Sequence, residues 1–118
     1  MSEARDLLRR LAAHDEPSLQ AVLAPTPEFD PDSELARPLD RRTRVLVRLA
    51  ALLAVGASTA SLRWATELVS AAGLDEDAVV GVLAAAAGAV GSARVVASAP
   101  RLALALGFDV EREPWDPA

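Results

Sequence analysis

The sequence predicts an all-α protein, a compact bundle of about five to six helices. Its apolar residues are mostly Ala, Leu and Val, with no Ile, and Ala and Leu are among the best helix formers. Few aromatic or β-branched residues are arranged in the alternation that a strand would show. The chain has 118 residues, of which 52% are apolar, so it has the length of one domain and enough apolar side chains for a core.

The first third of the chain predicts two short helices and a connection. Leucines at helical spacing indicate a helix over residues 2–13, and Pro17, a common first-turn residue, opens a second that ends at Ala24. Residues 25–38 hold four prolines and no helical period, which predicts an extended connection. We therefore expect residues 1–38 to form an N-terminal helical arm with a Pro-rich connection.

Two longer helices are expected next. Asp40 is a suitable N-cap for a helix over residues 41–55, in which Arg48 is the one polar residue after position 44, so this helix should be buried nearly all round. After Gly56, Ser58 or Thr59 caps a helix that runs to Ala72, before the stop at Gly73.

The last two helices follow the same logic. Acidic residues 75–77 suit the first turn of a helix with four consecutive alanines at its middle, where a neighbouring helix could approach closely. Ser92 should cap the final helix, which Pro100 should kink or split at Ala99 before Gly107 ends it. We expect residues 39–107 to form the helical core and residues 108–118 an acidic tail.

Charge and composition exclude several classes of function. The net charge of −5 disfavours a nucleic-acid partner, and the arginine cluster beside Asp40 is at most a candidate anion site; it comprises Arg41, Arg42, Arg44 and Arg48. With one histidine and no cysteine, the sequence offers no metal cluster, thiol chemistry or recognisable cofactor motif. The charged start is unlike a signal peptide, and the apolar stretch over 49–62 is too short to span a bilayer, so we expect a cytoplasmic protein without a membrane partner.

The core carries a resemblance to a known family. Residues 39–56 read Leu-Asp-Arg-Arg-Thr-Arg-Val-Leu-Val-Arg-Leu-Ala-Ala-Leu-Leu-Ala-Val-Gly, followed by a helix that ends at Gly73, a Leu-Asp-Glu-Asp start and an Ala-rich helix that ends near Gly91. This pattern resembles the carboxymuconolactone decarboxylase and alkyl hydroperoxidase D-like family of small all-helical proteins. The resemblance implies a homo-oligomer, a trimer or hexamer. Separately, Trp115 is the candidate anchor of the tail, packed either on its own domain or at a subunit interface.

The reactive residues of that family do not carry over. Where its peroxidase branch has a Cys-x-x-Cys pair and a His four residues later, this chain has Ser58, Ser61 and Ala65, and Val45 stands where an acid usually follows Thr-Arg. A serine hydroxyl cannot perform thiol–disulfide exchange, and alanine cannot relay a proton. The decarboxylase branch has polar residues at positions that here correspond to Ala85 and Ala89. The resemblance therefore implies the scaffold without the redox chemistry.

Few titratable residues remain as catalytic candidates. Arg63 and Glu67 stand four residues apart on one predicted helix, where they form either an i,i+4 ion pair or a weak catalytic pair. His14 is the only histidine, and it follows the first helix as a C-terminal cation would.

Two functions compete. The first is an oligomeric, non-redox binding or assembly module. The alternative is an enzyme of decarboxylase, cyclase or isomerase type that holds a small apolar metabolite, with Arg48 or Arg63 steering a carboxylate. The predicted ligand-binding residues for this alternative are Val45, Arg48, Leu49, Trp64, Ala65 and Ala85. A helical regulator of transcription is disfavoured, because the chain is acidic and lacks a polar recognition helix.

Overall fold

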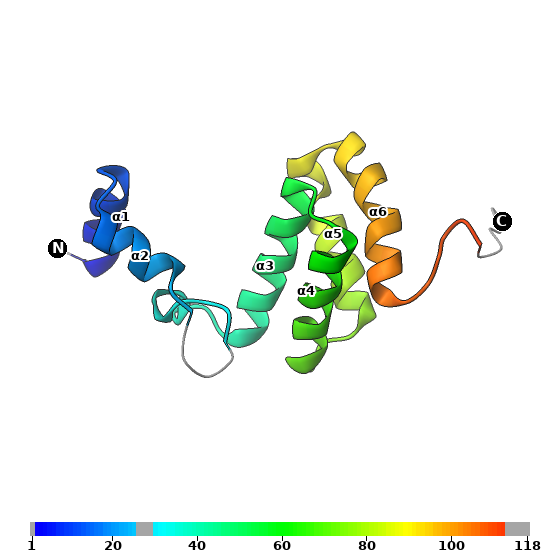
Figure 1. The fold of residues 1–118 in the computed structure, drawn as a ribbon, viewed down its shortest axis with the longest axis horizontal. Coiled ribbons are helices and arrows are strands. Elements are labelled where there is room, and N and C mark those ends of the chain that lie inside the picture. The colour runs from blue at the N-terminus through cyan, green and yellow to red at the C-terminus, as the bar shows by residue number, and fades with distance from the viewer. Residues whose placement is uncertain (1, 26–29, 113–118) are drawn as a thin grey trace. The chain divides into compact units, whose positions relative to one another are not determined.

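The all-α prediction is confirmed. A computed structural model describes residues 2–25 and 30–112, and its regular elements over these ranges are all helical (Figure 1). They are α1 (Glu3–Ala12), α2 (Glu16–Leu23), the 3-10 helix η1 (Glu34–Ala36), α3 (Arg41–Val55), α4 (Thr59–Ala71), α5 (Glu76–Val90) and α6 (Ser92–Leu106). The chain divides into two units, Met1–Asp40 and Arg41–Ala118, called here the arm and the bundle. None of the helices described is both long enough and apolar enough for a membrane span.

Side-chain N-caps stabilise the two helices of the arm. Ser2 accepts a hydrogen bond from the N–H of Arg5 at the start of α1, and Asp15 accepts one from the N–H of Ser18 at the start of α2. The structure adds η1 within the connection that the sequence predicted to be extended, because the Ser33 hydroxyl accepts the Leu35 N–H at 3.1 Å and closes a short turn. Among the described residues, the fully buried apolar side chains all lie in the bundle.

The bundle places its four helices at the corners of a square. α4 packs against α3 and α6, and α5 packs against the same two helices, so α4 and α5 are diagonal to each other. α3 and α5 run in one direction and α4 and α6 in the other (Figure 1). The core between them consists of leucine, valine and alanine side chains; its buried members are Val45, Leu49, Leu53, Leu62, Ala65, Val69, Val79 and Leu102.

Two details of α6 differ from the sequence prediction. Ser92 is the first helical residue rather than the cap, a position taken by Gly91 with a φ of 88°. The helix also continues through Pro100, so the predicted split at Ala99 is wrong. A proline removes one N–H, and the carbonyl that loses its partner belongs to Val96, a residue that is 72% exposed, so that turn is open to solvent.

The prediction that residues 41–55 are buried nearly all round is also wrong. α3 buries one stripe, Val45, Leu49 and Leu53, each four residues from the next. Val47 and Val55 on the other side are 53% and 72% exposed. A helix at the corner of a four-helix bundle has no neighbour on its outer side, whatever its sequence.

Leu49 is the most completely buried leucine of the core, with no exposed surface. We expect Leu49→Ala to lower the free energy of unfolding by about 2–5 kcal/mol, because it removes apolar contacts and leaves a cavity. Urea unfolding followed by circular dichroism measures this. Val96→Ala at an exposed position of α6 is the control, with an expected change within about 0.5 kcal/mol; equal effects for the two variants would contradict the assigned core.

The cap of α2 makes the arm sensitive to acid. The hydroxyl and the N–H of Ser18 both donate to the Asp15 carboxylate, at 2.5 and 3.2 Å, and these bonds hold the pKa of Asp15 below its ordinary value of 3.8. Since the pKa is lower in the folded state, ionised Asp15 stabilises the fold above about pH 3.8, and this contribution disappears as the pH falls through the lowered pKa.

We expect Ser18→Ala to raise the pKa of Asp15 toward its ordinary value, because the first of the two donors is removed. Titration of the Asp15 carboxyl carbon by NMR measures the shift. Ser70→Ala, at an exposed serine of the bundle, should leave this titration unchanged, and an unchanged Asp15 pKa in Ser18→Ala would show that the hydroxyl does not hold the carboxylate.

Candidate functional site

The structure divides the predicted ligand-binding residues among three places. Val45, Leu49 and Ala65 are members of the buried core, each 4% exposed or less. Arg48 of α3 and Trp64 of α4 stack on each other across the two helices. Ala85 is exposed on α5 and lines a separate groove.

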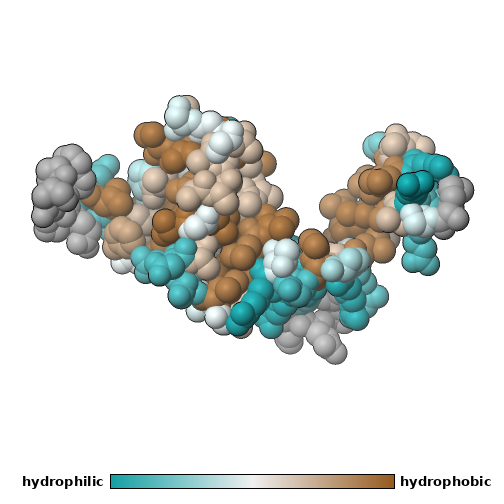
Figure 2. All heavy atoms as spheres, turned by 180° about the vertical axis from the view of Figure 1, so that it is seen from behind, coloured by the Kyte–Doolittle hydropathy of each residue, from teal (hydrophilic) through white to brown (hydrophobic). Residues whose placement is uncertain are grey.

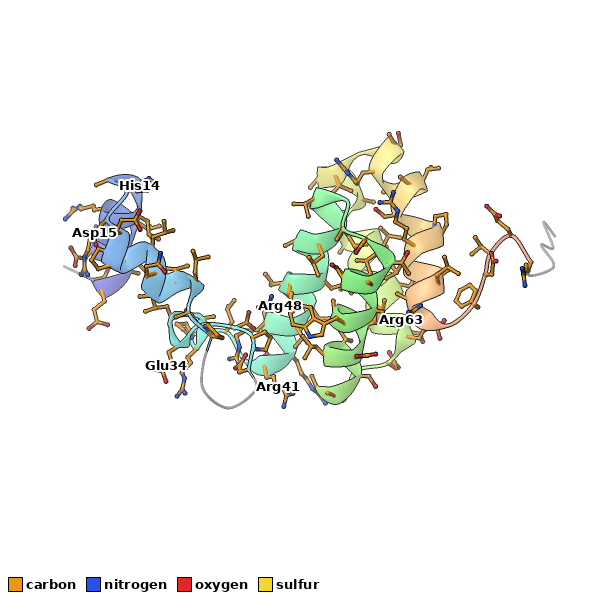
Figure 3. All side chains as sticks on the ribbon, in the orientation of Figure 1. His14, Asp15, Glu34, Arg41, Arg48 and Arg63 are labelled. Carbon is orange, nitrogen blue, oxygen red and sulfur yellow. The ribbon has the colours of Figure 1, made fainter. Side chains whose placement is uncertain are left out.

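Arg48 and Trp64 form the clearest side-chain pair of the six. The guanidinium carbon of Arg48 lies 5.1 Å from the centroid of the Trp64 ring, within the range of a cation–π contact (Figure 3). Trp64 remains 43% exposed, and Arg48 is half-buried. The contact holds the α3 cation against α4, so in this structure Arg48 serves helix packing.

Ser58, Ala65 and Val45, whose positions the sequence pattern compares with reactive residues of another family, have roles in the fold here. Ser58 is the N-cap of α4: its hydroxyl oxygen accepts the Ser61 N–H at 3.2 Å, and the two hydroxyl oxygens lie 3.3 Å apart. Ala65 and Val45 are 1% and 4% exposed and fill the core between α4 and α3. In this structure Ser58 therefore serves as a helix cap, and Val45 and Ala65 serve as core residues.

Three arginines cap the ends of other helices. Arg42 donates to the carbonyl of Ala72 after α4 at 3.4 Å, and Arg101 donates to the carbonyl of Gly56 after α3 at 3.2 Å. Arg63 donates to the carbonyl of Leu104 in the last turn of α6 at 3.4 Å. The last carbonyls of a helix have no partner within the helix and attract cations, so these contacts stabilise the bundle.

The catalytic candidates therefore have local partners or stand apart. Arg63, predicted to pair with or act beside Glu67, reaches across to α6, and Glu67 is exposed on α4. His14 lies in the arm with a φ of 58°, and its Nε2 is 3.2 Å from Oε1 of Glu16 (Figure 3). Arg63 is therefore engaged at the last turn of α6, and His14 has a neighbour within the arm.

The bundle offers a groove that the sequence did not indicate. It lies between α3 and α5 and has a volume of about 520 Å³. Its lining consists of Thr43, Leu46, Val47, Ala50, Ala78, Gly81, Val82, Ala85 and Ala86. Thr43 is the one polar residue among these described lining residues, and none of them is charged. The groove is therefore suited to apolar contact rather than to acid–base chemistry.

One wall of this groove is the most apolar and least buried helix of the bundle. The sequence of α5 carries no charge after Asp77, yet Val79 is its only fully buried residue. Its exposed positions recur every three or four residues on one side: Val80, Gly81, Ala84, Ala85, Gly88 and Ala89. Figure 2 views the bundle from the side on which α5 lies and shows brown and pale-brown atoms over its middle. Helical periodicity could have marked this stripe, which begins at the exposed Glu76 and Asp77, but no polar residue after them identifies it as the outer side.

A second groove, of about 640 Å³, lies within the arm, where α1, α2 and η1 meet. Two of its three charged lining residues, which also include Glu3, are engaged locally: Arg10 pairs with Asp6, and Asp15 caps α2. The ion pair stabilises α1 and the cap stabilises α2, so Arg10 and Asp15 are less suited to bind a ligand.

No group of three or more His, Cys, Asp or Glu side chains within residues 2–25 and 30–112 is placed to hold a metal ion. Trp115 lies outside the described residues. Comparisons with protein-family models, with curated proteins and with solved structures found no match. The surfaces and contacts of the chain itself therefore carry the functional argument.

The contact between Arg48 and Trp64 can be measured directly. A double-mutant cycle with Arg48→Leu and Trp64→Leu should give a coupling energy of about 0.5–1 kcal/mol, as expected for a partly exposed cation–π pair. Denaturant unfolding of the four proteins supplies the energies. A second cycle that combines Arg48→Leu with Val96→Ala should be additive, and a coupling of zero in the first cycle would remove the energetic role of the stack.

Proposed function

We propose that this chain is a non-redox protein of the carboxymuconolactone decarboxylase-like type that acts as an oligomeric binding or assembly module. The order of helices and the sequence pattern of residues 39–91 support the scaffold. The use of Ser58 as a cap and of Ala65 as a core residue supports the loss of the family's chemistry.

The exposure of α5 is the observation that carries the proposal. A helix that is apolar all round is expected in the interior of a larger structure, but α5 has one buried residue out of fifteen. Each Å² of such surface that leaves water contributes about 25 cal/mol, and contiguous apolar patches of this kind mark interaction sites. Contact with another protein surface would bury α5 as its sequence demands.

The association state of the full chain tests this function. We expect a homo-oligomer, a trimer or hexamer, in size-exclusion chromatography with light scattering and in native mass spectrometry. The assembly should carry the mass of whole chains only, without redox activity toward peroxide. A protein that stays monomeric at every concentration and retains no partner would contradict the proposal.

The α3–α5 groove favours one alternative, an enzyme or binding protein for a small apolar metabolite. Its volume of about 520 Å³ falls within the range of ligand sites, and its lining is almost entirely apolar. Arg48 and Arg63 are engaged elsewhere, so such a molecule would be held by shape. A reproducible small-molecule adduct in native spectra of the protein, lost in Ala85→Phe, would favour this alternative.

A further inference from the structure

We propose that the groove between α3 and α5 receives α5 of a second copy of this chain, antiparallel and about a two-fold axis. This inference rests on the proposed assembly function and names the surface that performs it. In a two-fold interface the same patch serves on both subunits. α5 meets that condition because it is both a wall of the groove and an exposed apolar ridge beside it.

Two glycines in α5 indicate the close approach of another backbone. Gly81 and Gly88 are seven residues apart, both exposed on the same side of the helix, and a Cβ on either would meet nothing within 4 Å. Packing within the chain therefore gives no reason for glycine, which is less favourable than alanine inside a helix. With Ala84 and Ala85 between them, they leave a flat seam on which a second helix could lie at about 8 Å, the short end of interaxial distances.

Charge decides the direction of the pairing. Asp75, Glu76 and Asp77 stand at the start of α5, and the next charged residue along the chain is Arg94. Arg94 lies at the opposite end of the α3–α5 face, because a side chain on Gly56, just after α3, would collide with its guanidinium. An antiparallel pair brings the acidic start of each α5 to the end that carries Arg94 of the other copy. A parallel pair would set the two Arg94 side chains at one end and the two acidic starts at the other, where the arginines at the start of α3 offset part of the negative charge.

The area of the surface formed by α3 and α5 determines how stable a contact between two copies can be. Two helices of fifteen residues are about 22 Å long and together about 20 Å wide, so the face covers roughly 450 Å² on each copy. The total is below the roughly 1,200–2,000 Å² of standard stable interfaces. We therefore expect the two-fold contact to dissociate on dilution, alone or as one contact of a larger assembly.

Sedimentation velocity of the full chain over a wide range of concentration tests the contact. Ala85→Glu places a charge in the groove at an exposed position, and Gly81→Leu fills the seam with a good helix former. We expect each to lower the particle mass at least twofold while circular dichroism remains helical. Ala60→Glu is the matched control, since Ala60 is exposed on α4, diagonal to α5, and its particle mass should equal that of the wild type.

Charge reversal tests the direction. Glu76→Arg with Asp77→Arg should promote dissociation, and addition of Arg94→Glu should restore the particle mass, because the attractive pairs are re-formed with opposite signs. Failure of Arg94→Glu to restore it would overturn the antiparallel arrangement.

The outcomes separate this inference from the function on which it rests. A wild-type protein that is monomeric throughout would overturn both. An oligomeric wild type whose mass is unchanged in Ala85→Glu and in Gly81→Leu would leave the assembly function intact and overturn the α5 pairing. Loss of a small-molecule adduct in these variants, without any change in particle mass, would assign the groove to a ligand instead.

Discussion

A helix at the corner of a four-helix bundle can bury only the stripe that faces the other three, and the rest of this structure depends on that limit. α3 fills its stripe with Val45, Leu49 and Leu53, and α4 fills its own with Leu62, Ala65 and Val69. Apolar residues on the other sides of these two helices, such as Val47 on α3 and Trp64 on α4, remain exposed to solvent. α5 shows the limit most clearly, because it brings the most apolar sequence to the bundle and buries least of it. Its apolar surface exceeds what the fold of one chain can use.

Four arginines of the bundle contact helix ends or an aromatic ring, and none of them lines the groove between α3 and α5. Arg42, Arg63 and Arg101 each reach a carbonyl at the end of another helix, and Arg48 lies over Trp64. A guanidinium suits both tasks, since it presents several donors in a plane and stacks on aromatic rings. Cations that the sequence suggested for anion binding, for catalysis or for carboxylate steering therefore stabilise helix ends and helix contacts. The groove between α3 and α5 is left without charge among its described lining residues.

The sequence predicted the helices well because their ends are set locally. Ser58 and Asp75 cap by hydrogen bonds within three residues, and Gly56, Gly73 and Gly107 end their helices with positive φ, so short windows of sequence suffice. The same windows could not tell which side of α3 or α5 faces the core, because beyond the first turn few polar residues mark the outer side. They also could not show that Arg63 reaches Leu104, a contact between residues 41 positions apart. The groove exists only through this long-range packing, so its residues could not be gathered from spacing alone.

The distribution of charge along the chain bears on whether copies of the bundle can meet. The net charge of −5 describes the whole chain, but in residues 41–107 the arginines outnumber the acidic side chains, and the excess of acid belongs to the arm and the tail. The bundle therefore carries an excess of positive charge, opposite in sign to the excess on the arm and the tail. An apolar face that carries no charge has nothing to prevent its contact with an identical face, and the charges at the two ends of α5 then select one direction for that contact. Small side chains supply the close fit and the end charges supply the orientation, so the same helix that the fold leaves unburied holds what a specific self-contact requires.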